Sequence, residues 1–430
     1  MRLPSTLIVI ALTGVALATP IPAAVATPYA PGEILVRFKG GSRERELKLP
    51  PGANVPDAVR HLRADPRVAY ANPDYVVTAA SFPNDPGSSG GPSGWTKDQW
   101  NFLAPAAWDP GGANVPAAWW NLRTRDRVGA KGVTVAVLDT GVAYRRKGRR
   151  FRRDPDLPPT RRFVYPKDYV GADRTPLDED GHGTHVTSTI AQSTNNQFGL
   201  TGISYGVDVM PVRVLDRHER GRGRNVTRGI RYAVRHGADV INLSLEFKPE
   251  VTMCAQIISV CEAIQRATHR GVVVVAAAGN RQSPKVAYPA RAPGAIAVGA
   301  TTYRSCLARY SDYGKGLDLV APGGGADTTL GTTGNYACDP LRPRYAIRQF
   351  SLKPRAAARG VFRKFGVVGL HGTSMSAAHV SGVAAMLRAL GYPPDRVESR
   401  LDRCARQVGE PRFYGAGLLN AGAATASRRC

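Results

Sequence analysis

From Trp95 to the end of the chain, short runs of consecutive apolar residues alternate with longer stretches of helical periodicity. Strands that are apolar at every position are buried on both faces, and helices between them supply the crossovers that keep such strands parallel. This pattern predicts a mostly parallel α/β sheet. The expected strands are 133–138, 207–214, 240–243, 272–276 and 295–298, and the expected helices are 183–192, 227–236 and 257–269.

The chain between Pro31 and about Ala80 has a pattern of its own. A segment of alternating polarity at 33–38 is followed by a possible helix at 55–62 and a second strand-like run at 68–77. Proline, glycine, serine and asparagine then dominate 81–94, which is typical of an exposed linker that proteases cut. A propiece followed by an enzyme has this organisation. The alternative is an N-terminal subdomain that is kept in the mature protein.

The extreme N-terminus has the features of a secretory signal peptide. Arg2 precedes an apolar run at 7–18, and Ala24-Val25-Ala26 has the small-x-small pattern that signal peptidase recognises. We therefore expect residues 1–26 to be removed on export. No later stretch approaches the about 20 continuous apolar residues that a spanning helix needs, so we expect an extracellular or periplasmic protein with no membrane association after signal removal.

The six cysteines agree with an oxidising compartment, and none of them forms the C-x-x-C pair of a zinc or redox site. The sequence alone leaves the pairing open, and we favour neighbours in order. The cysteines stand at positions 254, 261, 306, 338, 404 and 430.

The charge is strongly basic, with a formal net charge of +25 and a dense arginine cluster at 145–162. An anionic partner is one interpretation, and a solvated, arginine-rich surface is the one we favour. A nucleic-acid-binding module would need a recognisable reading element beside the charge, and the chain has none, so we expect no nucleic-acid partner.

Polar residues that follow the apolar runs are the first candidates for chemistry, because ligands of open α/β sheets bind outside the carboxyl ends of the strands. The run 133–138 ends in Asp139-Thr140-Gly141. Aspartic proteases also use D-T-G, but they need a second copy for their carboxylate pair. This chain has no other D-T-G or D-S-G, which argues against that class.

About forty residues later, Asp180-Gly181-His182-Gly183-Thr184-His185 opens a helical pattern, with glycines that would let a substrate approach the His182 ring. Two histidines three residues apart are also compatible with zinc ligation. The glutamate of H-E-x-x-H and a third ligand are both absent, so zinc is the weaker interpretation.

The third motif, Gly372-Thr373-Ser374-Met375-Ser376-Ala377-Ala378-His379, precedes another apolar helical run. A serine at a helix N-terminus is most often only a cap. Here, however, the chain order is Asp, His, Ser, which is the order of subtilisin and differs from the orders of chymotrypsin and the α/β-hydrolases.

Together these motifs resemble the subtilisin (subtilase) family of serine proteases. The similarity runs from about Trp95 to Ala424, and it implies a three-layer fold with a mostly parallel central sheet and helices on both faces. The implied domains are a small α+β propeptide at 27–80, a linker at 81–94 and a peptidase domain at 95–430. Further matching segments are 242–245, 276–280, 295–300, 320–323 and 414–420.

The resemblance implies a secreted endopeptidase in which Ser374 is the nucleophile, His182 the general base and Asp139 the carboxylate that orients the histidine. Asn280 matches the family's oxyanion-hole asparagine, and the backbone amide of Ser374 would be the second donor. No cofactor is needed for this chemistry. Asn196 resembles a residue of a family calcium-binding loop, so a structural calcium ion is plausible.

The expected substrate-binding segments match family strands that pair with an extended peptide. They are Leu243, Ser244, Leu245, Glu246, Ala277, Ala278 and Gly279. Glu246 stands where relatives carry glycine, so it could favour basic side chains, or it could point to solvent. The presumed self-cleavage region 76–81 contains no arginine or lysine. We therefore favour broad specificity or a preference for small residues.

We expect a monomer whose partners are protein or peptide substrates and its own propeptide. Two rival functions remain at this point: a kexin-like processing protease selective for basic residues, and a non-catalytic binding protein that uses the basic surface. The insertions at 145–162 and 325–368 have no counterpart that we can assign.

Overall fold

The computed structural model describes residues 29–75, 83–106, 111–171, 175–330, 338–341, 344–427 and 430. The chain divides into two compact units, Met1–Ala80 and Ser81–Cys430. The predicted signal peptide and the presumed self-cleavage region lie outside the described residues.

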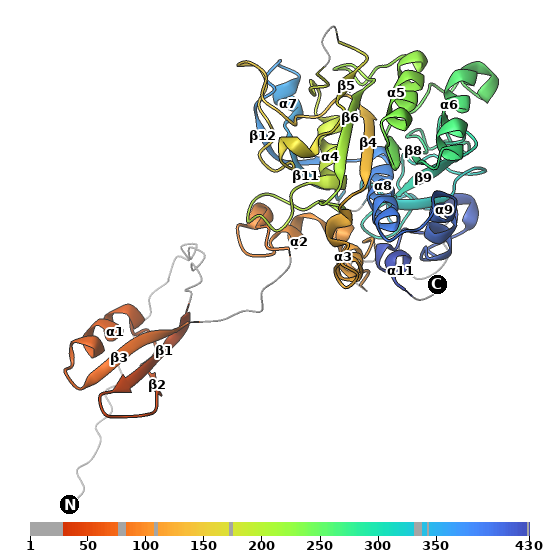
Figure 1. Ribbon diagram of the computed structural model, residues 1–430. Helices are drawn as coiled ribbons and strands as arrows, with labels where there is room; N and C mark the ends of the chain where they lie inside the picture. Colours follow the sequence, from red (N-terminus) through yellow and green to blue (C-terminus); the bar gives the residue numbers. More distant parts are fainter. Residues whose placement is uncertain are drawn as a thin grey trace, which may run out of the picture. The chain divides into compact units, whose positions relative to one another are not determined.

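The first unit is a three-stranded antiparallel sheet with one helix, shown in red and orange in Figure 1. The strands are β1 (Tyr29–Phe38), β2 (Arg45–Lys48) and β3 (Val68–Tyr75), in the order β2-β1-β3, and the helix is α1 (Val55–Ala64). The Asn54 side chain caps α1 by accepting the N–H of Asp57. Ile34 and Val36 of β1 pack with Val55 and Val59 of α1. These contacts form a separate small core.

The second unit contains a seven-stranded sheet in the order β10-β9-β8-β7-β4-β6-β5, and every neighbouring pair is parallel. Its strands are β4 (Thr134–Asp139), β5 (Lys167–Asp168), β6 (Asp208–Arg213), β7 (Val240–Leu243), β8 (Val273–Ala277), β9 (Ala295–Thr301) and β10 (Leu319–Pro322). The predicted parallel α/β sheet is confirmed. Only the short edge strands β5 and β10 were not predicted.

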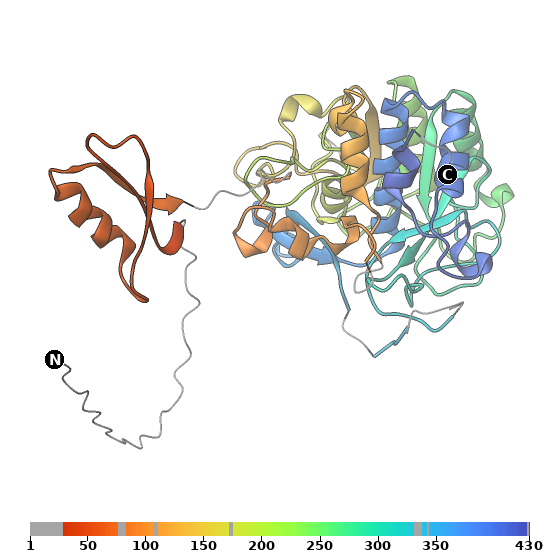
Figure 2. The same cartoon turned by 90° about the horizontal axis from the view of Figure 1, so that it is seen from below.

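Helices cover both faces of this sheet (Figures 1 and 2). Alternate residues of β4 show the two layers: Val135 and Val137 belong to one buried cluster, and Ala136 and Leu138 to the other. The helices are α2 (Trp95–Asp98), α3 (Val115–Arg123), α4 (His182–Ala191), α5 (Gly223–Arg235), α6 (Ile258–His269), α8 (Thr373–Ala389), α9 (Pro394–Arg403), α10 (Pro411–Tyr414) and α11 (Ala421–Thr425). Short 3-10 helices occupy Gly87–Ser89, Trp100–Phe102, Val128–Ala130, Thr160–Arg162 and Cys254–Ile257.

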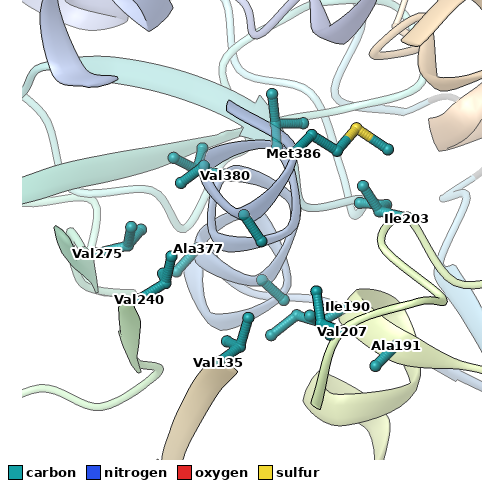
Figure 3. Close-up of a cluster of buried hydrophobic side chains, with 14 of the residues drawn as sticks. Val135, Ile190, Ala191, Ile203, Val207, Val240, Val275, Ala377, Val380 and Met386 are labelled. Carbon is teal, nitrogen blue, oxygen red and sulfur yellow. The ribbon is translucent and has the colours of Figure 1, made fainter. Parts of the chain in front are cut away.

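Helix α8 lies at the centre of the larger cluster (Figure 3). Ala377 and Val380 face Val240 and Val275 of the sheet, and the helix is buried from Thr373 to Leu387. Small residues let the helix approach the strands closely. This burial fixes the position of its first turn, which carries Ser374.

The insertion at 325–368 forms a β-hairpin of β11 (Ile347–Leu352) and β12 (Phe365–Leu370), with α7 (Pro354–Ala357) between the strands. It meets the basic insertion at 145–162. The rings of Phe151 and Phe362 stack with centroids 4.9 Å apart, and the Arg150 guanidinium lies 4.8 Å from the Phe362 ring centroid. Two segments that the sequence left unassigned therefore pack against each other.

Residues 83–94, expected to be an exposed linker, belong to the second unit and are buried in part. Asp85 is fully buried, and its carboxylate accepts the N–H groups of Asn195 and Asn196. The Trp95 indole donates to the carbonyl of Pro83. Turn-forming composition determines the local backbone and not its burial, so a loop rich in proline and glycine can still pack on a domain.

The disulfides join Cys254 to Cys261, Cys306 to Cys338 and Cys404 to Cys430, which confirms the pairing of neighbours. Within the described ranges, no helix has both the length and the apolar character needed to cross a membrane.

Candidate active site

Asp139 and His182 are brought together by the ends of two elements. Asp139 is the last residue of β4, and His182 is the first residue of α4. Asp139 Oδ1 lies 2.8 Å from His182 Nδ1 and also accepts the N–H of Thr140 at 2.7 Å. Because the carboxylate is fully buried, it holds the proton of the imidazole on Nδ1. The other ring nitrogen, Nε2, is then an acceptor.

The electrostatic environment makes the His182 ring more basic. Burial lowers the pKa of His182, but the charge and hydrogen bond of Asp139 more than offset this effect, and Glu219 and Asp180 act in the same direction. The net result is a raised pKa. The ring is therefore a stronger base than an isolated histidine.

A second buried aspartate, Asp178, fixes the start of α4. Its Oδ1 accepts the hydroxyl of Thr140 at 3.0 Å and the N–H of Gly181 at 2.9 Å, and its Oδ2 accepts both the N–H and the hydroxyl of Thr184. Asp178 thus ties the loop after β4 to the first turn of α4. The sequence interpretation missed it, although the run Asp178-Glu179-Asp180 before the histidine motif was a visible signal.

The structure explains why position 183 is a glycine in a way that the sequence interpretation did not. A Cβ at this position would lie 3.0 Å from Asp139 Oδ1 and would collide with the carbonyl of Gly141. The glycine therefore lets α4 approach β4 closely enough for the His182–Asp139 contact, rather than only giving a substrate access to the ring.

Ser374 is held at the N-terminus of α8 by a chain of buried hydrogen bonds. Its backbone carbonyl accepts the hydroxyl of Ser244 at 2.8 Å, Ser244 Oγ accepts Asn242 Nδ2 at 2.9 Å, and Asn242 Oδ1 accepts the hydroxyl of Ser381 at 2.9 Å. The Ser374 side chain donates to the carbonyl of Ser244 at 3.4 Å. In this conformation the described contacts do not include a hydrogen bond between Ser374 and His182.

Asn280 has a defined amide orientation. Its Oδ1 accepts the N–H of Thr373 at 2.9 Å and the Thr373 hydroxyl at 3.0 Å. With the oxygen engaged, the Nδ2 group is left as a donor. The N–H of Ser374 lies in the first turn of α8, where backbone donors have no partner within the helix.

One cavity of about 270 Å³ collects these groups. His182, Ser374 and Asn280 line it, together with the predicted substrate-binding residues Ser244, Leu245, Glu246 and Ala277. The cavity does not include Leu243, Ala278 or Gly279. Leu243 and Ala278 are fully buried in the second hydrophobic cluster, because strand alternation directs their side chains away from this face.

Glu246 neither points freely to solvent nor stands unpaired at the cavity. Its carboxylate forms an ion pair with Arg281, with 3.0 Å between Oε1 and Nη2, and its other oxygen accepts the N–H of Asn280 at 3.2 Å. Arg281 also lines the cavity. The sequence interpretation did not single out Arg281, because the two positions meet only in the folded chain.

The other candidate histidine, His185, lies outside the cavity. It is fully buried, its Nε2 is 3.1 Å from the carbonyl of Ile347, and burial lowers its pKa to about 3. Among the described residues, no group of three or more histidine, cysteine or acidic side chains is placed to hold a metal ion. The two histidines of the motif therefore do not form a zinc site.

Comparisons with known proteins agree with this geometry. The model of the subtilase family matches residues 130–417. The chain is 31% identical over 418 residues to the thermophilic serine proteinase of Bacillus sp. (strain AK1), covering 91% of this chain and 86% of the relative. It is 35% identical over 298 residues to subtilisin BL of Lederbergia lenta, covering 68% of this chain and 91% of that protein.

A solved structure of a protease from Pseudoalteromonas arctica PAMC 21717 superimposes with a TM-score of 0.63 and is 29% identical, covering 81% of this chain and 99% of that one. The matched family model spans β4 to the segment after α10 and includes every residue of the cavity described above. The chain belongs to the subtilase family and is a subtilisin-like serine endopeptidase.

Proposed function

We propose that Ser374, His182 and Asp139 are the catalytic triad of this endopeptidase. The observation that carries the proposal is the 2.8 Å contact between His182 Nδ1 and the buried Asp139, together with a cavity that both His182 and Ser374 line. A serine hydroxyl is a weak nucleophile at neutral pH, so it needs a neighbouring base. Nε2 of His182 is the acceptor in this cavity that can take the proton.

The reaction follows from these positions. The Ser374 hydroxyl turns from the Ser244 carbonyl to His182 Nε2, transfers its proton there and attacks the substrate carbonyl carbon. His182 then returns the proton to the leaving amine. In the second half of the reaction, His182 takes a proton from water, the water oxygen attacks the acyl carbon, and the proton returns to Ser374 Oγ as the acid product leaves. Asp139 stays ionised and stabilises the transient imidazolium. These residues supply every proton transfer in the sequence.

Asn280 Nδ2 and the N–H of Ser374 are the proposed donors to the oxyanion. The negative charge that develops on the carbonyl oxygen is stabilised by donors that are already oriented, and the positive end of the α8 dipole adds to the effect. Thr373 supports this role by holding Asn280 Oδ1.

The proposal is tested by covalent labelling with a fluorophosphonate. We expect the unmutated enzyme to be labelled on Ser374, and the Ser374→Ala and His182→Ala variants to remain unlabelled. A Ser399→Ala variant serves as the control, because Ser399 is a half-buried serine of α9 that does not line the cavity. Labelling of Ser374→Ala at the normal rate would refute the assignment, and absence of labelling in the unmutated protein would support a non-catalytic binding protein.

For specificity, we propose either broad cleavage or a preference for small residues at the bond cut. The Glu246 carboxylate already forms an ion pair with Arg281, which argues against its selecting a basic side chain of the substrate. A peptide series that varies the residue before the cleaved bond distinguishes this preference from kexin-like processing. Strong selection for paired basic residues would favour the kexin-like alternative.

We further propose export and self-processing, with a signal peptide at 1–26, a propeptide at 27–80, a linker at 81–94 and the peptidase at 95–430. The separate core of the first unit supports a propeptide that folds as its own body. The expected products are a monomeric peptidase and a propeptide that binds it.

A structural calcium ion is proposed at the loop that contains Asn196. Two fully buried carboxylates, Asp85 and Asp156, face this loop, and Asn196 Nδ2 lies 3.1 Å from Asp156 Oδ1. Burial raises the pKa of Asp156 to about 8, and the nearby charges of Asp154 and Asp85 act in the same direction. Oxygen donors of this kind suit calcium, with the Asn196 amide and backbone carbonyls completing the set.

This proposal predicts a calcium effect on stability that grows with pH. The folded chain without metal holds a proton on Asp156 up to about pH 8, so its stability decreases as the pH rises above the ordinary aspartate value. Calcium binds the ionised carboxylates and offsets this loss. We expect Tm to fall in EGTA more at pH 9 than at pH 5, and the Asp156→Asn variant to lose the difference. Equal Tm values with and without calcium at pH 9 would contradict the proposal.

A further inference from the structure

A second cavity, of about 470 Å³, adjoins the one that His182 and Ser374 line. Asn280 and Arg281 line both cavities, so the two meet at the side chain proposed to bind the oxyanion. Arg309, Arg344 and His371 form much of the remaining wall. A substrate bound at Ser374 therefore has a second, separate space beside its reacting carbonyl.

This cavity is cationic. Among the residues that the structure describes, three arginines line it, and no aspartate or glutamate does. Arg281 is already paired with Glu246, whereas in the described part of the chain neither Arg309 nor Arg344 forms an ion pair with an acid. The adjacent segments 331–337 and 342–343 contain no acidic residue in their sequence. Two arginine charges are thus available to an anionic group.

The neighbouring titratable groups do not cancel this charge. Asp327 follows the wall residue Ala326, but it is buried and its carboxylate accepts the N–H of Asp339 at 3.1 Å. Partial burial and the charge of Arg344 lower the pKa of His371, so at neutral pH this ring contributes a hydrogen-bonding group rather than a charge.

The wall next to the nucleophile is rigidly built. The Tyr310 hydroxyl accepts the N–H of Gly372 at 2.9 Å and lies 2.8 Å from the carbonyl of Gly323. His371 is thereby fixed three residues before Ser374. Gly325 has a φ of +98°, and a Cβ there would lie 2.8 Å from the Tyr310 ring. The cavity is consequently a defined site rather than a gap between loose loops.

The position of the cavity indicates which part of a substrate it receives. The first cavity is bounded by Ser244–Glu246 and Ala277, the segments expected to hold the acyl part of the peptide. When the carbonyl oxygen of the cleaved bond points to Asn280, the amine part of the substrate extends away from Ser244–Glu246 and Ala277. The second cavity shares Asn280 with the first, and its other walls include His371, which leads into α8, and none of the segments expected to hold the acyl part.

We propose that this second cavity binds an acidic side chain of the substrate on the leaving-group side of the cleaved bond, through Arg309 and Arg344. The inference rests on the proposed catalytic triad, and it adds a substrate preference that the triad alone does not give. Guanidinium groups suit a carboxylate because they offer paired N–H donors in one plane.

The test uses peptides that share one cleavable bond and carry glutamate, glutamine or lysine at the first, second or third position after it. Cleavage sites are read by mass spectrometry, and kcat/KM is measured for each peptide. We expect glutamate to exceed glutamine by about three- to tenfold at one of these positions, the range for one or two partly exposed ion pairs. Raising the salt concentration should reduce the preference.

The variants Arg309→Gln and Arg344→Gln should each lower kcat/KM for the glutamate peptide more than kcat/KM for the glutamine peptide. Arg344→Glu should reverse the preference in favour of lysine. Arg359→Gln is the matched control, because Arg359 is an exposed arginine that does not line the cavity.

Equal cleavage of the glutamate and glutamine peptides by the unmutated enzyme would overturn the proposal, as would a preference that survives in the Arg309→Gln/Arg344→Gln double variant. An acidic preference confined to positions before the bond would also overturn it. Failure of the triad has a different signature, since no peptide of the series would then be cleaved.

Discussion

At the scale of single residues, the proposed site depends on side chains in which one polar atom is hydrogen-bonded within the protein and the other is available to the substrate or to Ser374. Thr373 engages Asn280 Oδ1 and so leaves Nδ2 as a donor. Asp139 engages His182 Nδ1 and so leaves Nε2 as an acceptor. These two atoms of the proposed site are oriented before substrate arrives, which is the condition under which electrostatic stabilisation of a transition state is most effective.

Replacing Asn280 by alanine should lower kcat while KM changes little, because the lost donor acts mainly on the charge that develops in the transition state. The expected loss is about 10²–10³-fold, a range that comes from subtilisin itself and not from this geometry. Steady-state kinetics on one soluble peptide measures it. A variant with unchanged kcat would remove Asn280 from the proposed oxyanion hole.

The raised pKa of His182 predicts the pH dependence of the enzyme. Only the neutral ring can accept the Ser374 proton, so kcat/KM should fall as the pH drops through the pKa of His182. Because Asp139 raises this pKa, the acidic limb should lie above the ordinary histidine value of about 6.5.

In the Asp139→Asn variant, the limb should move to lower pH and the maximal rate should fall by about 10⁴-fold, since the ring loses both its charge partner and its fixed tautomer. Profiles of kcat/KM against pH for the two proteins test this expectation. Coincident limbs would mean that Asp139 does not set the basicity of His182.

At the scale of elements, the proposed reacting groups lie where helices begin and strands end. Asp139 ends β4, while His182 and Ser374 lie in the first turns of α4 and α8. Burial of α8 in the larger hydrophobic cluster fixes one of these ends (Figure 3). The hydrogen bonds of Asp178 fix the other.

The Asp178→Asn variant should therefore lose both stability and turnover. An amide cannot accept all the bonds that the carboxylate accepts, and the expected decrease in the free energy of unfolding is about 2–3 kcal/mol. Urea denaturation and kcat of the same preparation measure the two effects. Glu262→Gln, which alters an exposed ion pair with Arg266, should change stability by less than about 0.5 kcal/mol. Equal behaviour of the two variants would contradict the role of Asp178.

The elements themselves were largely predictable from the sequence. Strands β4, β6, β7, β8 and β9 are built largely from apolar, often β-branched residues, and such segments predict buried parallel strands. Strand β5 has only two residues, and β10 has four and ends in proline, so neither carries enough pattern to be recognised. The hairpin of β11 and β12 was missed because glycines interrupt the alternation of β12.

The residues of the proposed site could be predicted only where a reactive side chain stands in a recognisable motif next to a predicted strand or helix. Asp139, His182, Ser374 and Asn280 each follow or open an element and could be proposed from their motifs. The Glu246–Arg281 pair and the contact of Asp85 with Asn195 and Asn196 join distant positions. Such pairs have no signature in a single sequence, because only the fold brings them together.

At the scale of the whole molecule, one sheet carries two hydrophobic cores, and all the proposed catalytic groups lie beside it. The first unit has a core of its own and shares no residue with either cluster. This organisation suits a precursor in which removal of the first unit leaves the catalytic unit intact. Some of the arginines that give the chain its basic net charge lie in the insertions, and three of them line the cationic cavity beside Asn280.

The most direct test of the central claim is to express the full chain and its Ser374→Ala variant, and to follow both by intact mass and by casein hydrolysis. The account predicts that only the unmutated chain sheds the segment before about Ser81 and digests casein, while Ser399→Ala behaves like the unmutated chain. If the Ser374→Ala chain is processed and digests casein at the same rate, Ser374 is not the nucleophile and the proposed mechanism is wrong.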